Sequence, residues 1–179
     1  MKTLEQVFQK YCSTEGGGDK GSLHSYIEVY AREMTKTRDV DLLEVGVWEG
    51  HSLAMWEDYF TGSRVIGVDV DLSRCKFDVD ARQCDATSKE ALDSTLDDDV
   101  FDYIIDDGSH RPDHQVRSFE LLWDRVKPGG KYFIEDIDND DALVSIGETI
   151  AKMGVEFTVY DLRDKKGRWD DIMVVARRD

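Results

Sequence analysis

The segment that decides the fold runs from residue 42 to residue 53 and reads Leu-Leu-Glu-Val-Gly-Val-Trp-Glu-Gly-His-Ser-Leu. It begins as an apolar run typical of a buried strand, breaks at Gly46 and Gly50, and continues as an amphipathic helix. Strand, glycine-containing turn and helix make up the first part of a βαβ unit. The free N–H groups at such a helix N-terminus can bind an anionic group of a ligand, and Ser52 can add a hydroxyl donor.

A second strand is predicted at 64–71, and its acid Asp69 follows the glycine turn by about 20 residues. An acid in this position can accept hydrogen bonds from ribose hydroxyls, which predicts a ligand that contains adenosine. Trp48 stands where a dinucleotide-binding turn has its second glycine, and this argues against NAD. The frame of Glu44, Gly46, Gly50 and Ser52 resembles the first motif of class I S-adenosylmethionine (SAM) methyltransferases.

The composition is that of a water-soluble globular protein. The 179 residues are 40% hydrophobic and 35% charged, without an apolar run of about 18 residues or the apolar core of a signal peptide. We expect one domain, 1–179, with 1–36 as an N-terminal helical cap, in the cytoplasm. Cys12, Cys75 and Cys84 show no metal-binding spacing and are expected to be free thiols. The net charge of −16 disfavours nucleic acid and membrane surfaces as partners.

The order of predicted elements indicates an α/β fold. Strands are expected at 40–47, 64–71, 81–85, 101–107, 131–136, 155–162 and 171–176. Helices are expected at 2–12, after the segment 19–26 to about 35, and at 53–60, 87–96, 112–126 and 138–153. A glycine-rich connector is expected at 13–19. This order predicts a doubly wound, mostly parallel, seven-stranded sheet with a C-terminal antiparallel hairpin. Ligands of such sheets bind at the carboxyl ends of the strands.

Acidic residues end two of these strands. Asp106 and Asp107 end the fourth strand, and Glu135 and Asp136 follow the fifth. If these strands pair, their ends lie about 5 Å apart, and the carboxylates repel one another unless a cation lies among them. Oxygen ligands favour Mg²⁺, then Mn²⁺ or Ca²⁺. The alternative is that each acid caps the element that follows it.

A histidine follows the first acidic pair. His110 lies three residues after Asp107, where a neutral imidazole can take a proton from a substrate hydroxyl. The alternatives are a surface or capping histidine, or a zinc site shared with His114, for which no third ligand is evident nearby.

Six segments together resemble the macrolide-sugar O-methyltransferase group, which includes mycinamicin and tylosin methyltransferases and cephalosporin hydroxylase-like proteins. They are Asp19–Gly21 with His24 and Tyr26, Leu43–Gly50, Gly67–Asp69, Ile105–His110, Lys127–Gly130 and Ile134–Asp136. The resemblance implies SAM, Mg²⁺ and methylation of a sugar hydroxyl. It makes Asp107, Glu135 and Asp136 metal ligands and His110 the general base. Members of that group are longer than this chain, so the acceptor stays open.

By the same resemblance, the cofactor would place its carboxylate near Ser52, its ribose on Asp69 and its adenine near Asp85. Lys20 either pairs with the cofactor carboxylate or is a surface lysine. The residues expected to bind the cofactor are Lys20, Glu44, Gly46, Trp48, Gly50, Ser52, Asp69, Asp85 and Asp106.

Other functions remain alternatives. A catechol or phenolic O-methyltransferase would use the same cation but a lysine base, for which the sequence offers no clear candidate. A non-catalytic SAM-binding module would need the glycine turn and Asp69 but not His110 with three acids. The expected partner is a small-molecule hydroxyl acceptor, and a homo-oligomer is open.

Overall fold

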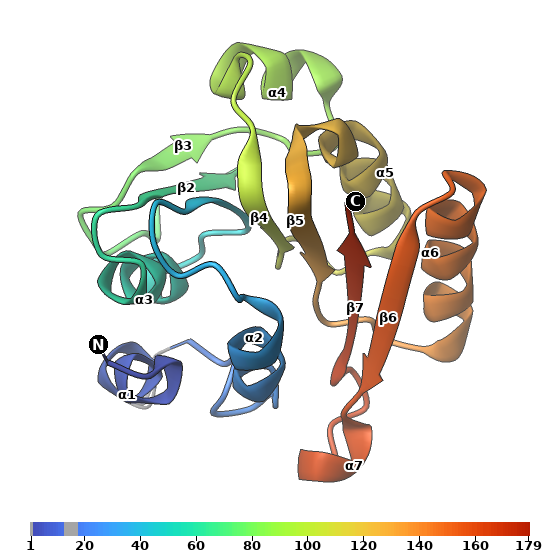
Figure 1. The fold of residues 1–179 in the computed structure, drawn as a ribbon, viewed down its shortest axis with the longest axis horizontal. Coiled ribbons are helices and arrows are strands. Elements are labelled where there is room, and N and C mark those ends of the chain that lie inside the picture. Colours follow the sequence, from blue (N-terminus) through green and yellow to red (C-terminus); the bar gives the residue numbers. More distant parts are fainter. Residues whose placement is uncertain (1, 13–17) are drawn as a thin grey trace.

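The computed structural model describes residues 2–12 and 18–179, so most of the predicted connector at 13–19 lies outside the described residues. One seven-stranded sheet has the order β3-β2-β1-β4-β5-β7-β6 (Figure 1). The first five strands are parallel, and β7 runs antiparallel to both β5 and β6, which confirms the predicted fold class and hairpin. The strands are β1 Asp41–Val45, β2 Arg64–Asp69, β3 Ala81–Gln83, β4 Phe101–Asp106, β5 Val126–Ile134, β6 Glu156–Asp161 and β7 Ile172–Arg177.

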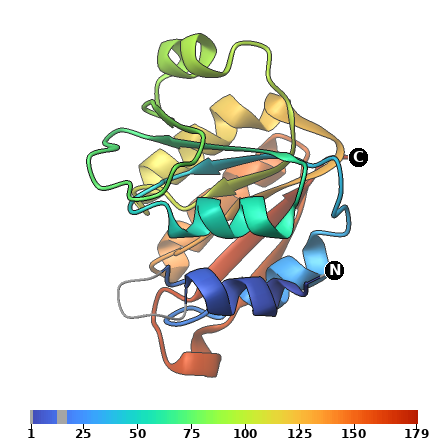
Figure 2. The ribbon, with the colours of Figure 1, turned by 90° about the vertical axis from the view of Figure 1, so that its left-hand side faces the viewer.

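Helices cover both faces of the sheet. The helices are α1 Leu4–Tyr11, α2 Ile27–Glu33, α3 His51–Tyr59, α4 Lys89–Leu96, α5 Pro112–Leu122, the 3₁₀ turn η1 Trp123–Arg125, α6 Asp140–Lys152 and α7 Arg163–Lys166. Helices α1 to α3 pack on one face and α4 to α6 on the other, and Figure 2 shows the sheet between α1 and α3 on one side and α4 on the other. Leu42 and Leu43 point to opposite faces and are both fully buried, as expected of a parallel strand covered on both sides.

Several boundaries differ from the prediction. The helix expected to end at Val126 ends at Leu122, and β5 begins at Val126 instead of at Lys131. Residues 127–130 belong to the strand at a register shift against β4, which accommodates Pro128 because proline has no N–H to donate. A short helix, α7, occupies the loop predicted between the last two strands. Among the described helices, none has the length and apolar composition needed to cross a membrane.

The register of the sheet brings the acidic strand ends together. Val45 is paired with Asp106, and Asp106 with Ile134, so β1, β4 and β5 end side by side. The N–H of Asp107 donates to Val45 O at 2.9 Å, and the N–H of Glu135 donates to Asp106 O at 3.0 Å. The predicted pairing of the fourth and fifth strands is therefore confirmed.

Candidate active site

A cavity of about 680 Å³ lies at the carboxyl ends of β1, β2 and β4, a volume suited to a small organic ligand. Nine of the predicted site residues line it: Lys20, Gly46, Trp48, Ser52, Asp69, Asp85, Asp106, Asp107 and His110. Four others lie outside its lining: Glu44, Gly50, Glu135 and Asp136. Most of the predicted residues therefore line one cavity, and the other four lie outside its lining.

The glycine turn fits tightly against the end of β4. Gly46 has φ +93°, and a Cβ at this position would lie 2.0 Å from the carbonyl oxygen of Asp107. Gly50 has φ +85° and precedes α3 as its N-cap. Only glycine tolerates both the left-handed backbone and the contact at position 46.

Asp69 holds the turn in shape. Its Oδ2 accepts the N–H groups of Val47 at 2.7 Å and of Trp48 at 3.1 Å. Trp48, which donates one of these hydrogen bonds, has a left-handed backbone with φ +49°. The Trp48 side chain is 62% exposed, and the guanidinium of Arg74 lies 4.2 Å from its ring centroid, a cation–π contact that the sequence analysis missed.

Three further predicted cofactor residues have partners within the chain. The Ser52 hydroxyl donates to Glu44 at 2.7 Å. Asp85 accepts the hydroxyl and N–H of Thr87, and these bonds lower the pKa of Asp85. Burial raises the pKa of Asp106 to about 7, and a hydrogen bond from the Gly108 N–H lowers this pKa by less than burial raises it.

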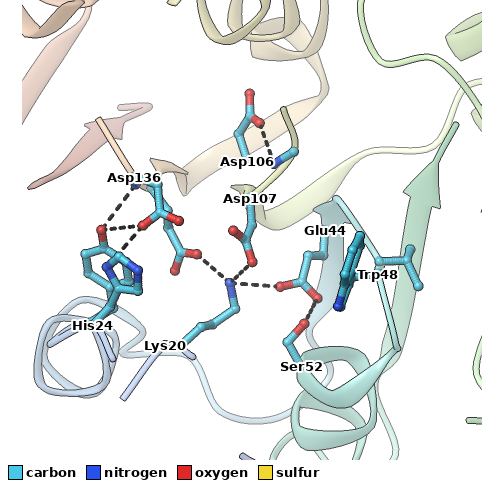
Figure 3. A network of polar contacts seen from close by, with 12 residues as sticks. Lys20, His24, Glu44, Trp48, Ser52, Asp106, Asp107 and Asp136 are labelled. Atoms are coloured by element: carbon cyan, nitrogen blue, oxygen red, sulfur yellow. Dashed lines mark hydrogen bonds and ion pairs between the residues drawn. The ribbon is translucent and has the colours of Figure 1, made fainter. Parts of the chain in front are cut away.

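Lys20 lies among three carboxylates (Figure 3). Its ammonium is 2.6 Å from Asp107 Oδ2, 2.5 Å from Glu135 Oε2 and 3.2 Å from Glu44 Oε1. The side chain is 1% exposed, so the surface-lysine alternative is wrong. Burial by itself would lower the pKa of Lys20, but the three carboxylates outweigh it and hold the pKa well above its usual value. The residue is therefore a cation and a poor candidate for the lysine base of a catechol-type enzyme.

Two tyrosines of the N-terminal cap bind the acids after β5. The Tyr30 hydroxyl donates to Glu135 Oε1, so both oxygens of this buried carboxylate have partners. The Tyr26 hydroxyl donates to Asp136 Oδ1 at 2.7 Å and accepts the Asp136 N–H at 3.2 Å. The sequence analysis gave Tyr26 no role, since a hydroxyl 110 residues away carries no local signal.

Two groups among the described residues could hold a metal ion. One is Asp107, His110 and Asp136, and the other is Asp19, His24 and Asp136. Within each group, the candidate ligand atoms all lie within 4.8 Å of one another. His110 Nε2 is 3.7 Å from Asp136 Oδ2, and its buried Nδ1 has no hydrogen-bond partner among the described residues. Carboxylate oxygens with one imidazole fit a divalent cation.

The other candidate ligands are directed elsewhere. Glu135 belongs to neither group, because its oxygens face Lys20 and Tyr30. His114 also lies outside both groups and pairs through Nδ1 with Ser109 Oγ at 2.8 Å, which leaves the two-histidine zinc site without support.

Backbone strain is concentrated at this site. Of the five described non-glycine residues with positive φ, three belong to the cavity or its acid group: Trp48, His110 and Asp136. Left-handed backbone at non-glycine residues costs about 1–3 kcal/mol each and often accompanies function. The strain therefore supports a functional role for this edge of the sheet.

The segment that carries Lys20 is held by residues near β7. Lys166 donates to the carbonyl oxygens of Gly21 and His24 at 2.5 and 2.6 Å. The N–H of Ser25 donates to Asp171 Oδ1 at 3.1 Å. Lys20 is therefore positioned by contacts that span most of the chain.

Comparisons with known proteins identify the family to which this fold belongs. Residues 43–137 match a family model described as a methyltransferase domain, and the chain belongs to this family. A rhamnosyl tetracenomycin-C 2′-O-methyltransferase of Streptomyces olivaceus is 35% identical over 156 residues, which cover 73% of this chain and 41% of that protein. The mycinamicin VI 2″-O-methyltransferase of Micromonospora griseorubida is 36% identical over 129 residues, covering 65% of this chain and 32% of that protein.

A solved structure has the same fold. The MycE methyltransferase of the mycinamycin biosynthetic pathway, solved in complex with Mg, S-adenosylhomocysteine (SAH) and mycinamycin VI, matches with a TM-score of 0.76 and 22% identity. The match covers 99% of this chain and 53% of that one. The chain thus spans about a third to a half of the length of these relatives.

Proposed function

We propose that this domain transfers a methyl group from SAM to a hydroxyl of a sugar or another vicinal diol, with Mg²⁺ as the favoured cation and Mn²⁺ or Ca²⁺ as substitutes. The observation that carries the proposal is the approach of Asp107, His110 and Asp136 beside the cavity that the glycine turn lines. We assign the two carboxylates to the cation and His110 to the proton. The curated relatives, named as O-methyltransferases of glycosylated compounds, support the same chemistry and a sugar as acceptor.

The cavity offers a place for each part of the cofactor. Its lining includes Gly46 and Trp48 of the turn, Asp69 at the end of β2 and Asp85 after β3. We place the ribose on Asp69 and the adenine near Asp85. The acids along this edge also favour a positively charged sulfonium.

The transfer itself requires the acceptor oxygen, the methyl carbon and the sulfur in line. His110 would take the hydroxyl proton on Nε2 while the oxygen forms its bond to the methyl carbon. The carbon–sulfur bond breaks, and SAH is released. Asp136, 3.7 Å from His110 Nε2, would stabilise the imidazolium. A cation held by Asp107 and Asp136 would lower the pKa of the bound hydroxyl.

Glu135 is a third ligand only if it exchanges its contacts with Lys20 and Tyr30. A cytoplasmic location and a homo-oligomer stay predictions. The catechol alternative is less well supported, because Lys20, the one described lysine that lines the cavity, is held by three carboxylates.

Calorimetry and a transfer assay test the proposal. SAM, SAH and NADH are titrated with and without Mg²⁺, and labelled SAM is then incubated with glycosides that carry vicinal hydroxyls, the same glycosides with one hydroxyl blocked, and catechol. We expect SAM and SAH to bind, NADH not to bind, and label to enter only the free diols in the presence of Mg²⁺. Transfer that does not depend on Mg²⁺, or that favours catechol, would contradict the proposal.

A further inference from the structure

We propose that Lys20 is a positioning residue that serves as the built-in counter-ion of the acid cluster, and that it limits divalent-cation binding by competing for Asp107 and Glu135. The inference rests on the proposed metal site, and it assigns Lys20 a role other than cofactor binding. It predicts that the native site binds a divalent cation more weakly than its own carboxylates would allow.

Three carboxylates surround the Lys20 ammonium. Glu44 comes from β1, Asp107 follows β4 and Glu135 follows β5, so the ammonium joins three neighbouring strands (Figure 3). Glu44 and Glu135 are almost fully buried, at 0% and 1% exposure. Carboxylates brought this close in a poorly solvated site repel strongly without a cation. Lys20 supplies that cation from within the chain.

Asp107 is shared between Lys20 and the proposed cation site. This residue gives Oδ2 to Lys20 and also belongs to the group formed with His110 and Asp136. A divalent cation in that group therefore binds next to a fixed positive charge, which weakens its attraction to Asp107.

Glu135 has two partners within the chain. Lys20 and Tyr30 occupy both of its oxygens, so the carboxylate is withheld from the cation. Lys20 thus removes one ligand and weakens another. Both effects lower the affinity of the site for a divalent cation.

The test replaces Lys20 with a neutral side chain of similar shape, Lys20→Met. The matched control is Lys131→Met, which removes a largely buried lysine 2.7 Å from Glu33. For each protein, Mn²⁺ affinity is measured by electron paramagnetic resonance, and the melting temperature is measured with and without Mg²⁺. We expect Lys20→Met to melt at a lower temperature than the wild type when no metal is present. Mg²⁺ should raise the melting temperature of Lys20→Met by more than it raises that of the wild type. Lys20→Met should also bind Mn²⁺ at least about tenfold more tightly. Lys131→Met should melt at a lower temperature than the wild type, but its Mn²⁺ affinity and the effect of Mg²⁺ on its melting temperature should equal those of the wild type.

Equal or weaker Mn²⁺ binding by Lys20→Met would overturn the inference. If the wild type binds no Mn²⁺ but Lys20→Met does, the Mg²⁺-dependent reaction fails and the role of Lys20 stands. If Lys20→Met does not fold, the double variant Lys20→Met with Glu135→Gln removes one negative charge together with the positive one. Recovery of folding in the double variant supports the counter-ion role, and failure of both variants to fold refutes it.

Discussion

Gly46 and Asp107 meet backbone against backbone: a Cβ on residue 46 would lie 2.0 Å from the carbonyl oxygen of Asp107. The turn that we assign to the cofactor and the acid that we assign to the cation are therefore in direct backbone contact. A shift of either segment moves the other. This coupling fits a reaction in which sulfonium and acceptor hydroxyl must align closely.

Gly46→Ala should lower the free energy of unfolding by about 2–4 kcal/mol, because it adds both a strained left-handed backbone and a clash with Asp107. Urea unfolding measures the loss. Gly62→Ala is the matched control, since Gly62 has φ +83° with nothing within 4 Å of an added Cβ, and it should cost only about 1 kcal/mol. Equal costs for the two variants would show that the contact with Asp107 is not what requires glycine.

His110→Ala should reduce the rate of methyl transfer by about 10²- to 10⁴-fold while leaving SAM affinity unchanged, because the imidazole is assigned to proton removal alone. Single-turnover kinetics and calorimetry measure the two quantities. The control is His114→Ala, a cavity-lining histidine that pairs with Ser109 and should retain most of the activity. A His110→Ala protein with normal turnover would refute the base assignment.

Tyr26→Phe should weaken Mn²⁺ or Mg²⁺ binding about 10- to 100-fold, because the hydroxyl orients Asp136 through both its carboxylate and its N–H. Metal titration provides the measurement. Tyr160→Phe, which removes a hydroxyl that donates to Glu33 at a distance from the acid cluster, is the control and should leave metal affinity unchanged. If both variants bind metal like the wild type, Asp136 does not depend on Tyr26.

Glu33→Gln should destabilise the protein by about 1–3 kcal/mol at pH 7, and the difference from wild type should shrink in acid. Burial alone would raise the pKa of Glu33, but hydrogen bonds from Lys131 and Tyr160 outweigh it and lower the pKa. A carboxyl with a lowered folded pKa stabilises fully above its unfolded pKa, about 4.3, and loses this contribution as the pH falls through the folded value. Melting temperatures between pH 7 and pH 3 follow the effect, and a pH-independent difference would contradict it.

The sequence predicted those parts of the molecule that depend on local pattern. The apolar runs before Asp69, Asp106 and Glu135 mark buried strands, and parallel pairing then carries their acids to one edge. The glycine turn was likewise recognisable because its residues lie within ten positions of one another. The apolar runs and the glycine turn therefore sufficed to predict which strands end at this edge of the sheet.

The contacts of Lys20 could not be predicted in this way. Its ammonium meets Asp107 and Glu135 across 87 and 115 residues, and no periodicity connects such positions. Clustered acids need a compensating cation, and the sequence pattern does not distinguish a bound ion from an ammonium of the chain. The hydrogen bond from Ser52 to Glu44 likewise depends on how α3 packs beside β1, which the residue pattern does not state.

The bonds from Lys166 to Gly21 and His24 also bear on the order in which the protein matures during synthesis. Glu44, Asp107 and Glu135 all leave the ribosome before Lys166 does. Until the stretch around Lys166 is translated, the loop that carries Lys20 lacks the hydrogen bonds from Lys166. The ion pairs between Lys20 and the acids then lack this support. The acid cluster therefore reaches its docked form only after the stretch around Lys166 has left the ribosome.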